Sequence, residues 1–239
     1  MPSRNYKKNL PHRDSRYFVI VAEGEREDAY FQFFNGKNQR IRIEIVPRED
    51  NASAPTHFLN RLAKFKEEAG WNPKNNDVAW FVLDVDKWKQ EQIYQLIQYC
   101  KDNEVVNIAI SNPCFEVWLL YHLLDDLTDL SDNLKNELHI QAQNKGLKGY
   151  HPSTFCPLLE TAIQNAKNND TDIRHDFPNP NQTKVYLLGE QLLEKLGKNW
   201  LSDTEGEPQY NAKRLAKHMF RKAFIVGNLR RSVFIHQSR

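Results

Sequence analysis

Residues 17–24 read Tyr-Phe-Val-Ile-Val-Ala-Glu-Gly, a continuous apolar run that ends in a glutamate and a glycine. A helical pattern follows, from Glu25 to about Asn35. Strands of a parallel sheet are covered on both faces and therefore appear as unbroken apolar runs. The stretch thus predicts a buried strand, a tight turn and a helix, which together form the first unit of an α/β fold.

The same order of strand and helix repeats up to about residue 124. The expected strands are 17–22, 41–46, 78–85 and 105–110, and the expected helices are 25–35, 55–70, 90–101 and 113–124. Ser111 and Asn112 are expected to cap the last of these helices, with Pro113 at its first position. Strands that alternate with helices at this spacing predict right-handed crossovers and a parallel sheet.

Strand signals fade from residue 129 onward. Helices are expected over 131–143, 154–168 and 183–197, with loops over 169–182 and 202–209 and a basic helix over 210–224. The predicted division is a basic tail over 1–16, an α/β domain over 17–128, a helical completion over 129–201 and a basic extension over 202–239. The fold class is therefore α/β, a parallel sheet flanked by helices, with a mostly helical C-terminal half.

The composition excludes several classes of protein. The chain has 239 residues, of which 40% are hydrophobic and 27% charged, and this is ordinary for a globular protein. No apolar stretch reaches the ~18 residues of a membrane span, and the N-terminal residues are too polar for a secretory signal, so we expect a cytoplasmic protein without a membrane anchor. Its three cysteines lack metal-ligand spacing. No phosphate-binding glycine loop is present, so any ATP requirement must come from a partner.

The net charge of +2 conceals two basic ends. Residues 209–239 hold eight Lys and Arg and no acid, and residues 1–16 hold five against one acid, so the body between them is acidic. An acidic body with basic ends suits a metal site approached by a polyanion, although solubility alone would explain it too. The candidate nucleic-acid contacts at the C-terminal end are Lys213, Arg214, Lys217, Arg221 and Lys222. Docking of this segment on the body as an amphipathic helix is the alternative.

Acidic residues follow two of the predicted strands. Glu23 stands at the end of the first, and Asp84 and Asp86 stand at the end of another. In parallel sheets the ligand crevice lies at this edge, and side chains two apart on a strand face the same way. Crowded carboxylates repel one another unless a cation lies among them. Oxygen ligands without nearby Cys or His favour Mg²⁺ or Mn²⁺.

Further charged residues extend this candidate site. Glu27 comes four residues after Glu23, and Glu116 falls in the first turn of the helix expected after 105–110. Five carboxylates would suffice for two metals ~3.5–4 Å apart, the arrangement used for in-line phosphoester cleavage. Lys87 and Lys148 are candidates to contact the scissile phosphate. Each of these residues has a structural alternative, since acids favour helix N-termini by ~0.3–1 kcal/mol and most lysines are solvated.

Several stretches resemble a known family. Glu23-Gly24 and Asp84-Val85-Asp86 resemble the two acidic motifs of Toprim domains. A narrower resemblance, to the RloB-like family, spans about residues 17–197. It is carried by Val-Ala-Glu-Gly-Glu-Arg-Glu-Asp-Ala-Tyr-Phe (21–31), Phe-Val-Leu-Asp-Val-Asp (81–86), Ile-Ser-Asn-Pro-Cys-Phe-Glu-Val-Trp-Leu-Leu-Tyr-His (110–122) and Asn-Pro-Asn-Gln-Thr-Lys-Val (179–185).

The resemblance implies a Toprim-like fold and a metal-dependent endonuclease that cleaves DNA or RNA in anti-phage abortive infection, beside a separately encoded ATPase. By similarity, Glu23 would be a general acid/base or metal ligand, and Asp84 and Asp86 would be metal ligands. Glu27 matches a second glutamate of nuclease-type motifs, and Glu116 is matched to an extra carboxylate. Lys148 is the candidate catalytic cation. The basic extension over 202–239 lies beyond the usual family end.

Two other functions stay open at this point. The chain is alternatively a non-catalytic nucleic-acid-binding or regulatory subunit that partners an ATPase. A phosphatase acting on small phosphoesters would share the metal chemistry, although the basic C-terminal end argues mildly against it. The sequence also leaves open whether the substrate is DNA or RNA, tRNA included. It does not show whether one or two metals bind, or whether the chain forms a homo-oligomer.

Overall fold

The computed structural model describes residues 15–48, 56–73, 77–86, 88–197 and 200–201. The loop predicted over 202–209, the basic helix predicted over 210–224 and the predicted contact residues within it lie outside these ranges, as does Lys87. None of the helices in the described ranges is long and apolar enough to cross a membrane.

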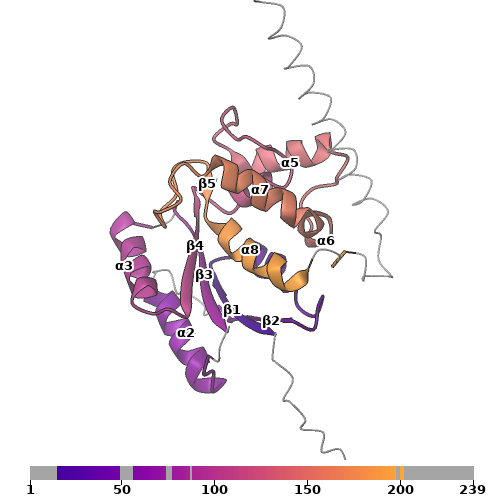
Figure 1. Cartoon of the computed structure of the whole chain (residues 1–239). Coiled ribbons are helices and arrows are strands. Elements are labelled where there is room, and N and C mark those ends of the chain that lie inside the picture. The colour runs from indigo at the N-terminus through magenta and orange to yellow at the C-terminus, as the bar shows by residue number, and fades with distance from the viewer. Residues whose placement is uncertain (1–14, 49–55, 74–76, 87, 198–199, 202–239) are drawn as a thin grey trace, which may run out of the picture.

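A five-stranded sheet forms the centre of the fold (Figure 1). Its strands are β1 (Arg16–Ala22), β2 (Ile41–Ile45), β3 (Val78–Asp84), β4 (Val106–Asn112) and β5 (Gln182–Thr183), in the spatial order β2-β1-β3-β4-β5. The first four are parallel, as predicted, and β5 pairs antiparallel with β4. The two residues of β5, in the region predicted as loop and helix start, are too few to show the alternation by which a strand is recognised.

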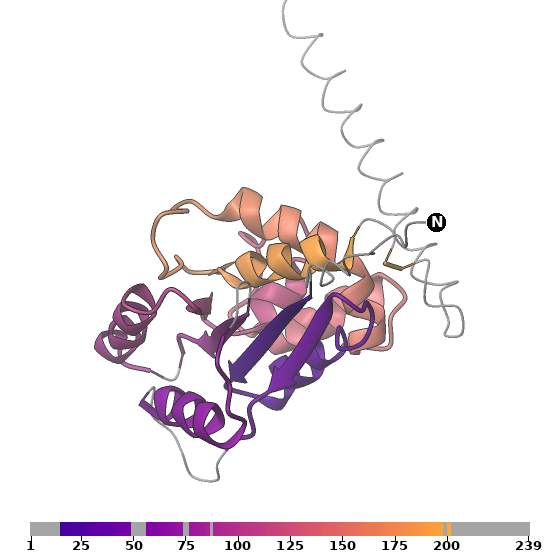
Figure 2. The same cartoon turned by 60° about the horizontal axis from the view of Figure 1, so that its bottom comes forward.

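Helices cover both faces of the sheet, which is why β1 is an unbroken apolar run. Phe18 and Ile20 pack in one hydrophobic cluster, while Val19 and Val21 pack in the other. The second cluster holds α2 (Thr56–Glu68) and α3 (Gln90–Lys101), and the first holds α1 (Glu25–Gln32), α4 (Glu116–Leu120), α7 (Leu159–Asn169) and α8 (Val185–Leu196). Figure 2 shows these two layers on opposite sides of the sheet.

The chain leaves the ends of β1 and β3 in opposite directions. The connection through α1 leads from β1 to its neighbour β2, toward one edge of the sheet. The connection through α3 leads from β3 to its neighbour β4, toward the opposite edge. Because α1 and α3 also pack on opposite faces, the carboxyl ends of β1 and β3 form the switch point at which open α/β sheets have their ligand crevice.

The C-terminal half is mostly helical, as expected, and consists of α5 (Leu134–Asn144), α6 (Pro152–Phe155), a single 3₁₀ turn over Cys156–Leu158, α7 and α8. The helix predicted over 154–168 is therefore divided. Pro157 lies at the division, where its missing N–H prevents a continuous ladder of helical hydrogen bonds.

The predicted helix cap after β4 is wrong. Strand β4 continues through Asn112, the Asn112–Pro113 bond is cis, and α4 begins only after this turn. The Asn112 side chain donates to the Pro178 carbonyl at 2.9 Å, and the Ser111 hydroxyl bonds that of Thr183 at 2.8 Å. Both polar side chains therefore tie β4 to the segment around β5 rather than capping the next helix.

A buried ion pair ties the segment before β5 to the start of α8. Lys184 Nζ lies 2.6 Å from Asp170 Oδ2, and both side chains are 1% exposed. The Tyr186 hydroxyl donates to the same Asp170 oxygen at 2.6 Å, and Lys184 also donates to the Asp172 carbonyl at 2.7 Å. The charge of Asp170 is thus balanced inside the protein.

Candidate functional site

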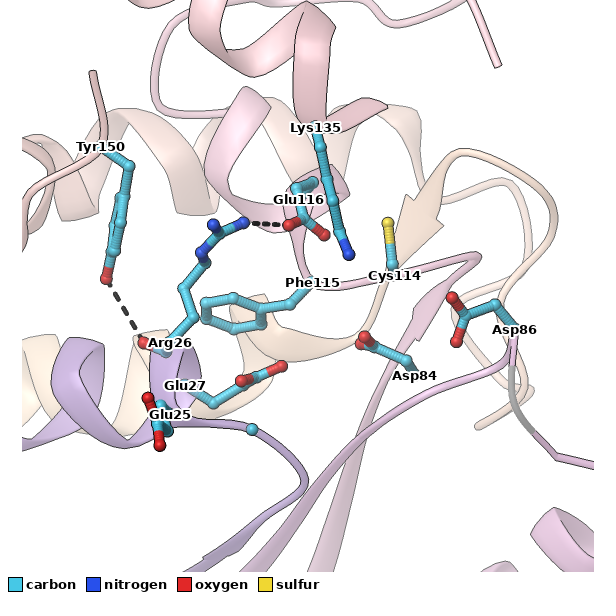
Figure 3. A pocket seen from close by; sticks show the side chains of 11 residues that line it. Glu25, Arg26, Glu27, Asp84, Asp86, Cys114, Phe115, Glu116, Lys135 and Tyr150 are labelled. Carbon is cyan, nitrogen blue, oxygen red and sulfur yellow. Dashed lines mark hydrogen bonds and ion pairs between the residues drawn. The ribbon is translucent and has the colours of Figure 1, made fainter. Parts of the chain in front are cut away.

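A hollow of about 460 Å³ opens at the switch point (Figure 3). Its walls come from the first turn of α1, the end of β3, the β4–α4 connection, α5 and the segment before α6. The lining residues are Gly24, Glu25, Arg26, Glu27, Asp84, Asp86, Cys114, Phe115, Glu116, Lys135 and Tyr150. Both the α/β part and the helical half therefore contribute to one site.

Two buried carboxylates face each other in this hollow. Glu27 is 5% and Asp84 7% exposed, and Figure 3 shows their carboxylates turned toward one another. Burial raises the pKa of Glu27 to about 7, and the charges of Glu23 and Glu116 add to this, against a hydrogen bond from its own backbone. Burial and the neighbouring Glu27 and Glu23 raise the pKa of Asp84 to about 9. Among the ion pairs of the described ranges, none involves either residue.

Gly24 makes room for the Glu27 carboxylate. A Cβ atom at Gly24 would lie 2.6 Å from Glu27 Oε2, far inside van der Waals contact. Glu27 can therefore fold back over the first turn of α1, where the helix dipole favours negative charge. The Glu-Gly pair after β1 thus has a steric role as well as an acidic one.

The turn after β4 holds Asp84 in place. The Phe115 backbone N–H donates to the Asp84 carboxylate and works against the raised pKa. The backbone N–H groups of Val85 and Asp86 donate to the Pro113 carbonyl at 3.0 and 3.1 Å. Asp86, two residues after Asp84, is exposed at the rim of the hollow.

Glu23 is not among the residues that line the hollow. Its Oε2 accepts hydrogen bonds from the Asp84 backbone N–H at 3.1 Å and from Trp88 Nε1 at 3.0 Å. Its charge still acts on both facing carboxylates. Trp88 and the end of β3 determine the orientation of the Glu23 carboxylate. Its role as acid, base or metal ligand stays a prediction.

Glu116 has a partner that sequence reasoning missed. Glu116 is 4% exposed as a residue, and its carboxylate pairs with the Arg26 guanidinium, as Figure 3 shows. Arg26 also lies over the Tyr150 ring, 5.7 Å from its centroid. A basic residue in the first turn of a helix opposes the helix dipole. This unusual position of a basic residue was the signal in the sequence that could have revealed a partner for Glu116.

The lysine in the hollow also differs from those expected. Lys135 of α5 lines the hollow, and Figure 3 shows its ammonium group extending toward Glu116 and Cys114. Lys148 is exposed and is not among the lining residues. No motif distinguishes Lys135 in the sequence, because only the packing of α5 against α4 brings it to the site.

The donor set suits a hard divalent cation, although no metal site is fully formed. In the described ranges, no group of three or more His, Cys, Asp and Glu side chains is arranged to hold a metal ion. Mg²⁺ often binds through only one or two carboxylates, with waters and substrate phosphates as its other ligands. A cation between Glu27 and Asp84 would remove their mutual repulsion, so these two residues fit a divalent metal ion.

Comparison with known proteins adds one finding. Residues 18–192 match the family model described as RloB-like protein. A search of the curated proteins gave no match, and neither did a search of the solved structures. The matched range starts in β1, ends in α8 and includes every lining residue of the hollow.

Proposed function

Because the chain belongs to the RloB-like protein family, we propose that it is a metal-dependent nuclease that cleaves phosphodiester bonds in DNA or RNA. The observation that carries the proposal is the facing pair of buried carboxylates, Glu27 and Asp84, at the switch point of the sheet. On the family resemblance, the proposal extends to a role in anti-phage abortive infection beside a separately encoded ATPase.

In this mechanism Glu27 and Asp84 would hold the metal, and Asp86 at the rim would be a third carboxylate ligand. A bound Mg²⁺ or Mn²⁺ supplies charge neutralisation at the phosphate and a water of lowered pKa. On this proposal Glu23, whose Oε2 accepts hydrogen bonds from Trp88 and from the Asp84 backbone, would be the carboxylate that exchanges a proton. The burial of the pair excludes bulk water and so strengthens each electrostatic contact.

Calorimetric titration with Mn²⁺ and Mg²⁺ tests the metal site. Wild type is expected to bind, and the Asp84→Ala/Asp86→Ala variant is expected not to. Glu67→Ala/Glu68→Ala is the matched control, because it removes two exposed charges at the end of α2, the helix that leads into the amino end of β3. A folded wild type that binds no divalent metal, even at millimolar concentration and with nucleic acid present, would contradict the proposal.

Cleavage assays with plasmid DNA and with tRNA then test the reaction. Metal-dependent cleavage by wild type that disappears in Asp84→Ala/Asp86→Ala, but not in the control, is the expected result. The assays should be run with and without the neighbouring ATPase, because a defence nuclease can be silent alone. Cleavage that persists in the Asp84→Ala/Asp86→Ala variant would rule out this site.

The second candidate is a non-catalytic nucleic-acid-binding or regulatory subunit. One observation favours it: within the described ranges, no three ligand side chains converge on one point. On this alternative the acids hold one metal or none, nucleic acid or the partner binds, and neither substrate is cleaved in any combination with the partner. The cleavage assays therefore decide between the two candidates.

A further inference from the structure

The hollow has two walls of opposite charge. One wall carries the facing carboxylates of Glu27, from α1, and Asp84, from the end of β3. The other wall, beside α4, carries Lys135 of α5 and the side chain of Arg26, which reaches across from α1 to Glu116. We propose that Arg26 and Lys135 bind a phosphate group of the substrate, with Glu116 as the residue that positions Arg26. The inference rests on the proposed function and specifies how the substrate is held at that site.

The surroundings of Arg26 fix the orientation of its guanidinium but leave part of that group exposed. Its Nη1 bonds the Glu116 carboxylate, and the Tyr150 ring lies beneath the guanidinium. The Tyr150 hydroxyl also donates to the Arg26 carbonyl at 3.4 Å. A guanidinium has about five N–H donors in a planar fork that matches phosphate oxygens. The Arg26 side chain is 41% exposed, so part of the fork is open to the hollow.

This arrangement assigns Glu116 a different role from that of a metal ligand. The carboxylate is buried beside a guanidinium, and its charge is balanced by that contact. A cation held in one orientation loses little entropy when a phosphate binds. Glu116 thus prepares Arg26 for an anion instead of adding a ligand to the metal.

Lys135 supplies the second positive charge. It stands at the start of α5 and extends toward the same wall as Glu116 (Figure 3). Its exposed ammonium group can follow a phosphate oxygen because the four-carbon stem is flexible. A phosphate between this wall and a metal on Glu27 and Asp84 would have positive charge on both sides.

A phosphate alone would be repelled by the carboxylates of the hollow, and a metal alone has few ligands there. Each should therefore raise the affinity of the other, and by thermodynamic linkage the two factors must be equal. Such a coupling between metal and phosphate is a signature that contact of phosphates with surface cations would not produce.

The test is calorimetry of the full-length protein with thymidine 5′-monophosphate, a single phosphate ester, with and without Mg²⁺. For wild type, Mg²⁺ should raise the affinity for the nucleotide by about tenfold, and the nucleotide should raise the affinity for Mg²⁺ equally. Arg26→Ala and Lys135→Ala should each weaken nucleotide binding by about tenfold, and Arg26→Lys by less. Neither alanine variant should weaken Mg²⁺ binding measured without nucleotide, as general damage to the site would.

Arg42→Ala and Lys167→Ala are matched controls. Arg42 stands on β2, near the amino ends of the strands, and Lys167 pairs with Glu190 on the surface of α7 and α8. Both should bind the nucleotide like wild type. Nucleotide binding by Arg26→Ala and Lys135→Ala at the wild-type affinity would overturn the inference, while wild-type Mg²⁺ binding and cleavage would leave the proposed function standing. Binding that needs Arg26 and Lys135 but not Mg²⁺ would support the anion site and count against the metal mechanism.

Glu116→Gln separates positioning from metal ligation. As a positioning residue, Glu116 should affect nucleotide binding only through Arg26, so Arg26→Ala/Glu116→Gln should be no weaker than Arg26→Ala alone. Mg²⁺ binding in the Arg26→Ala background should be unchanged by Glu116→Gln. A tenfold loss of Mg²⁺ affinity in that background would identify Glu116 as a ligand and overturn the positioning role.

Discussion

Asp170 and Asp84 are equally buried, at 7% exposure each, but they lie in opposite electrostatic surroundings. Asp170 has Lys184 and the Tyr186 hydroxyl on one oxygen. Asp84 has a backbone N–H and further carboxylates. Pairing with a cation offsets the cost of burying a carboxylate, whereas a buried carboxylate without a cation lowers stability until one arrives. The comparison separates a carboxylate that is paired within the fold from one that is proposed to bind a cation, without reference to a motif.

The largest effect is expected at the balanced site. Lys184→Met leaves Asp170 buried without its cation, so the free energy of unfolding should fall by about 3–5 kcal/mol. Urea unfolding followed by circular dichroism measures this. Lys167→Met, which breaks the surface pair with Glu190, should lower it by less than ~1 kcal/mol. Equal losses of unfolding free energy in the two variants would contradict the distinction between a balanced and an unbalanced carboxylate. So would a Lys184→Met variant that regains its stability when Mg²⁺ is added.

The opposite sign is expected at the unbalanced site. Asp84→Asn keeps the shape of the side chain. Near neutral pH the metal-free wild type folds only by taking up a proton on Asp84 that the unfolded chain has released, because the pKa of Asp84 is raised to about 9. The variant avoids this cost and should therefore be more stable than wild type without metal. The gain should be about 1–3 kcal/mol, less than the full pKa shift implies, because buried sites relax and admit water. Asp86→Asn at the exposed rim should change stability by less than ~0.5 kcal/mol. A less stable Asp84→Asn would place Asp84 in the same class as Asp170.

The pH dependence sharpens the same contrast. The pKa values of Glu27 and Asp84 are raised from 4.5 and 3.8 to about 7 and about 9, so the folded state retains protons that the unfolded chain releases. Stability of the metal-free protein should therefore fall as pH rises between the unfolded and folded pKa values, by up to about 1.4 kcal/mol per pH unit for each proton that the folded state retains. The difference between wild type and Glu27→Gln/Asp84→Asn isolates the pair. Saturating Mg²⁺ should flatten the slope, and identical slopes in wild type and variant would contradict the pKa shifts.

The smallest effect is expected from Gly24→Ala. The extended backbone of Gly24, with φ −129°, accepts alanine, but the new Cβ displaces the Glu27 carboxylate. Mg²⁺ affinity should fall several-fold, while stability should change by less than ~1 kcal/mol. Calorimetry of Gly24→Ala, Glu27→Gln and the double variant checks this, because effects exerted through Glu27 will not add. Additive losses would show that Gly24 acts independently.

Local sequence patterns predicted the fold well because its main features are local. Unbroken apolar runs revealed three of the parallel strands, and the alternation of apolar and charged residues revealed the fourth, β2. The acids that end two of these strands led to Glu27 and Asp84 in one hollow. The cap at Pro113 failed because Ser111 and Asn112 bond to a segment far along the chain.

The opposite wall of the hollow could not be predicted. Arg26 and Glu116 are 90 residues apart, and Lys135 arrives on a helix whose packing leaves no periodic signal at that position. A carboxylate at a strand end is predictable from the strand itself. A cation that faces it depends on tertiary contacts alone.

The hydrogen bond between Trp88 and Glu23 has an optical consequence. An indole whose N–H is bonded to a carboxylate emits light according to the charge and distance of that group, and this contact, at 3.0 Å, lies beside the facing carboxylates. Any event that draws Glu23 toward a cation therefore alters the emission of Trp88. The molecule carries an intrinsic fluorophore at its candidate site. Trp88→Phe, which keeps the other tryptophans of the chain, provides the reference emission to be subtracted, so that occupancy can be followed in real time.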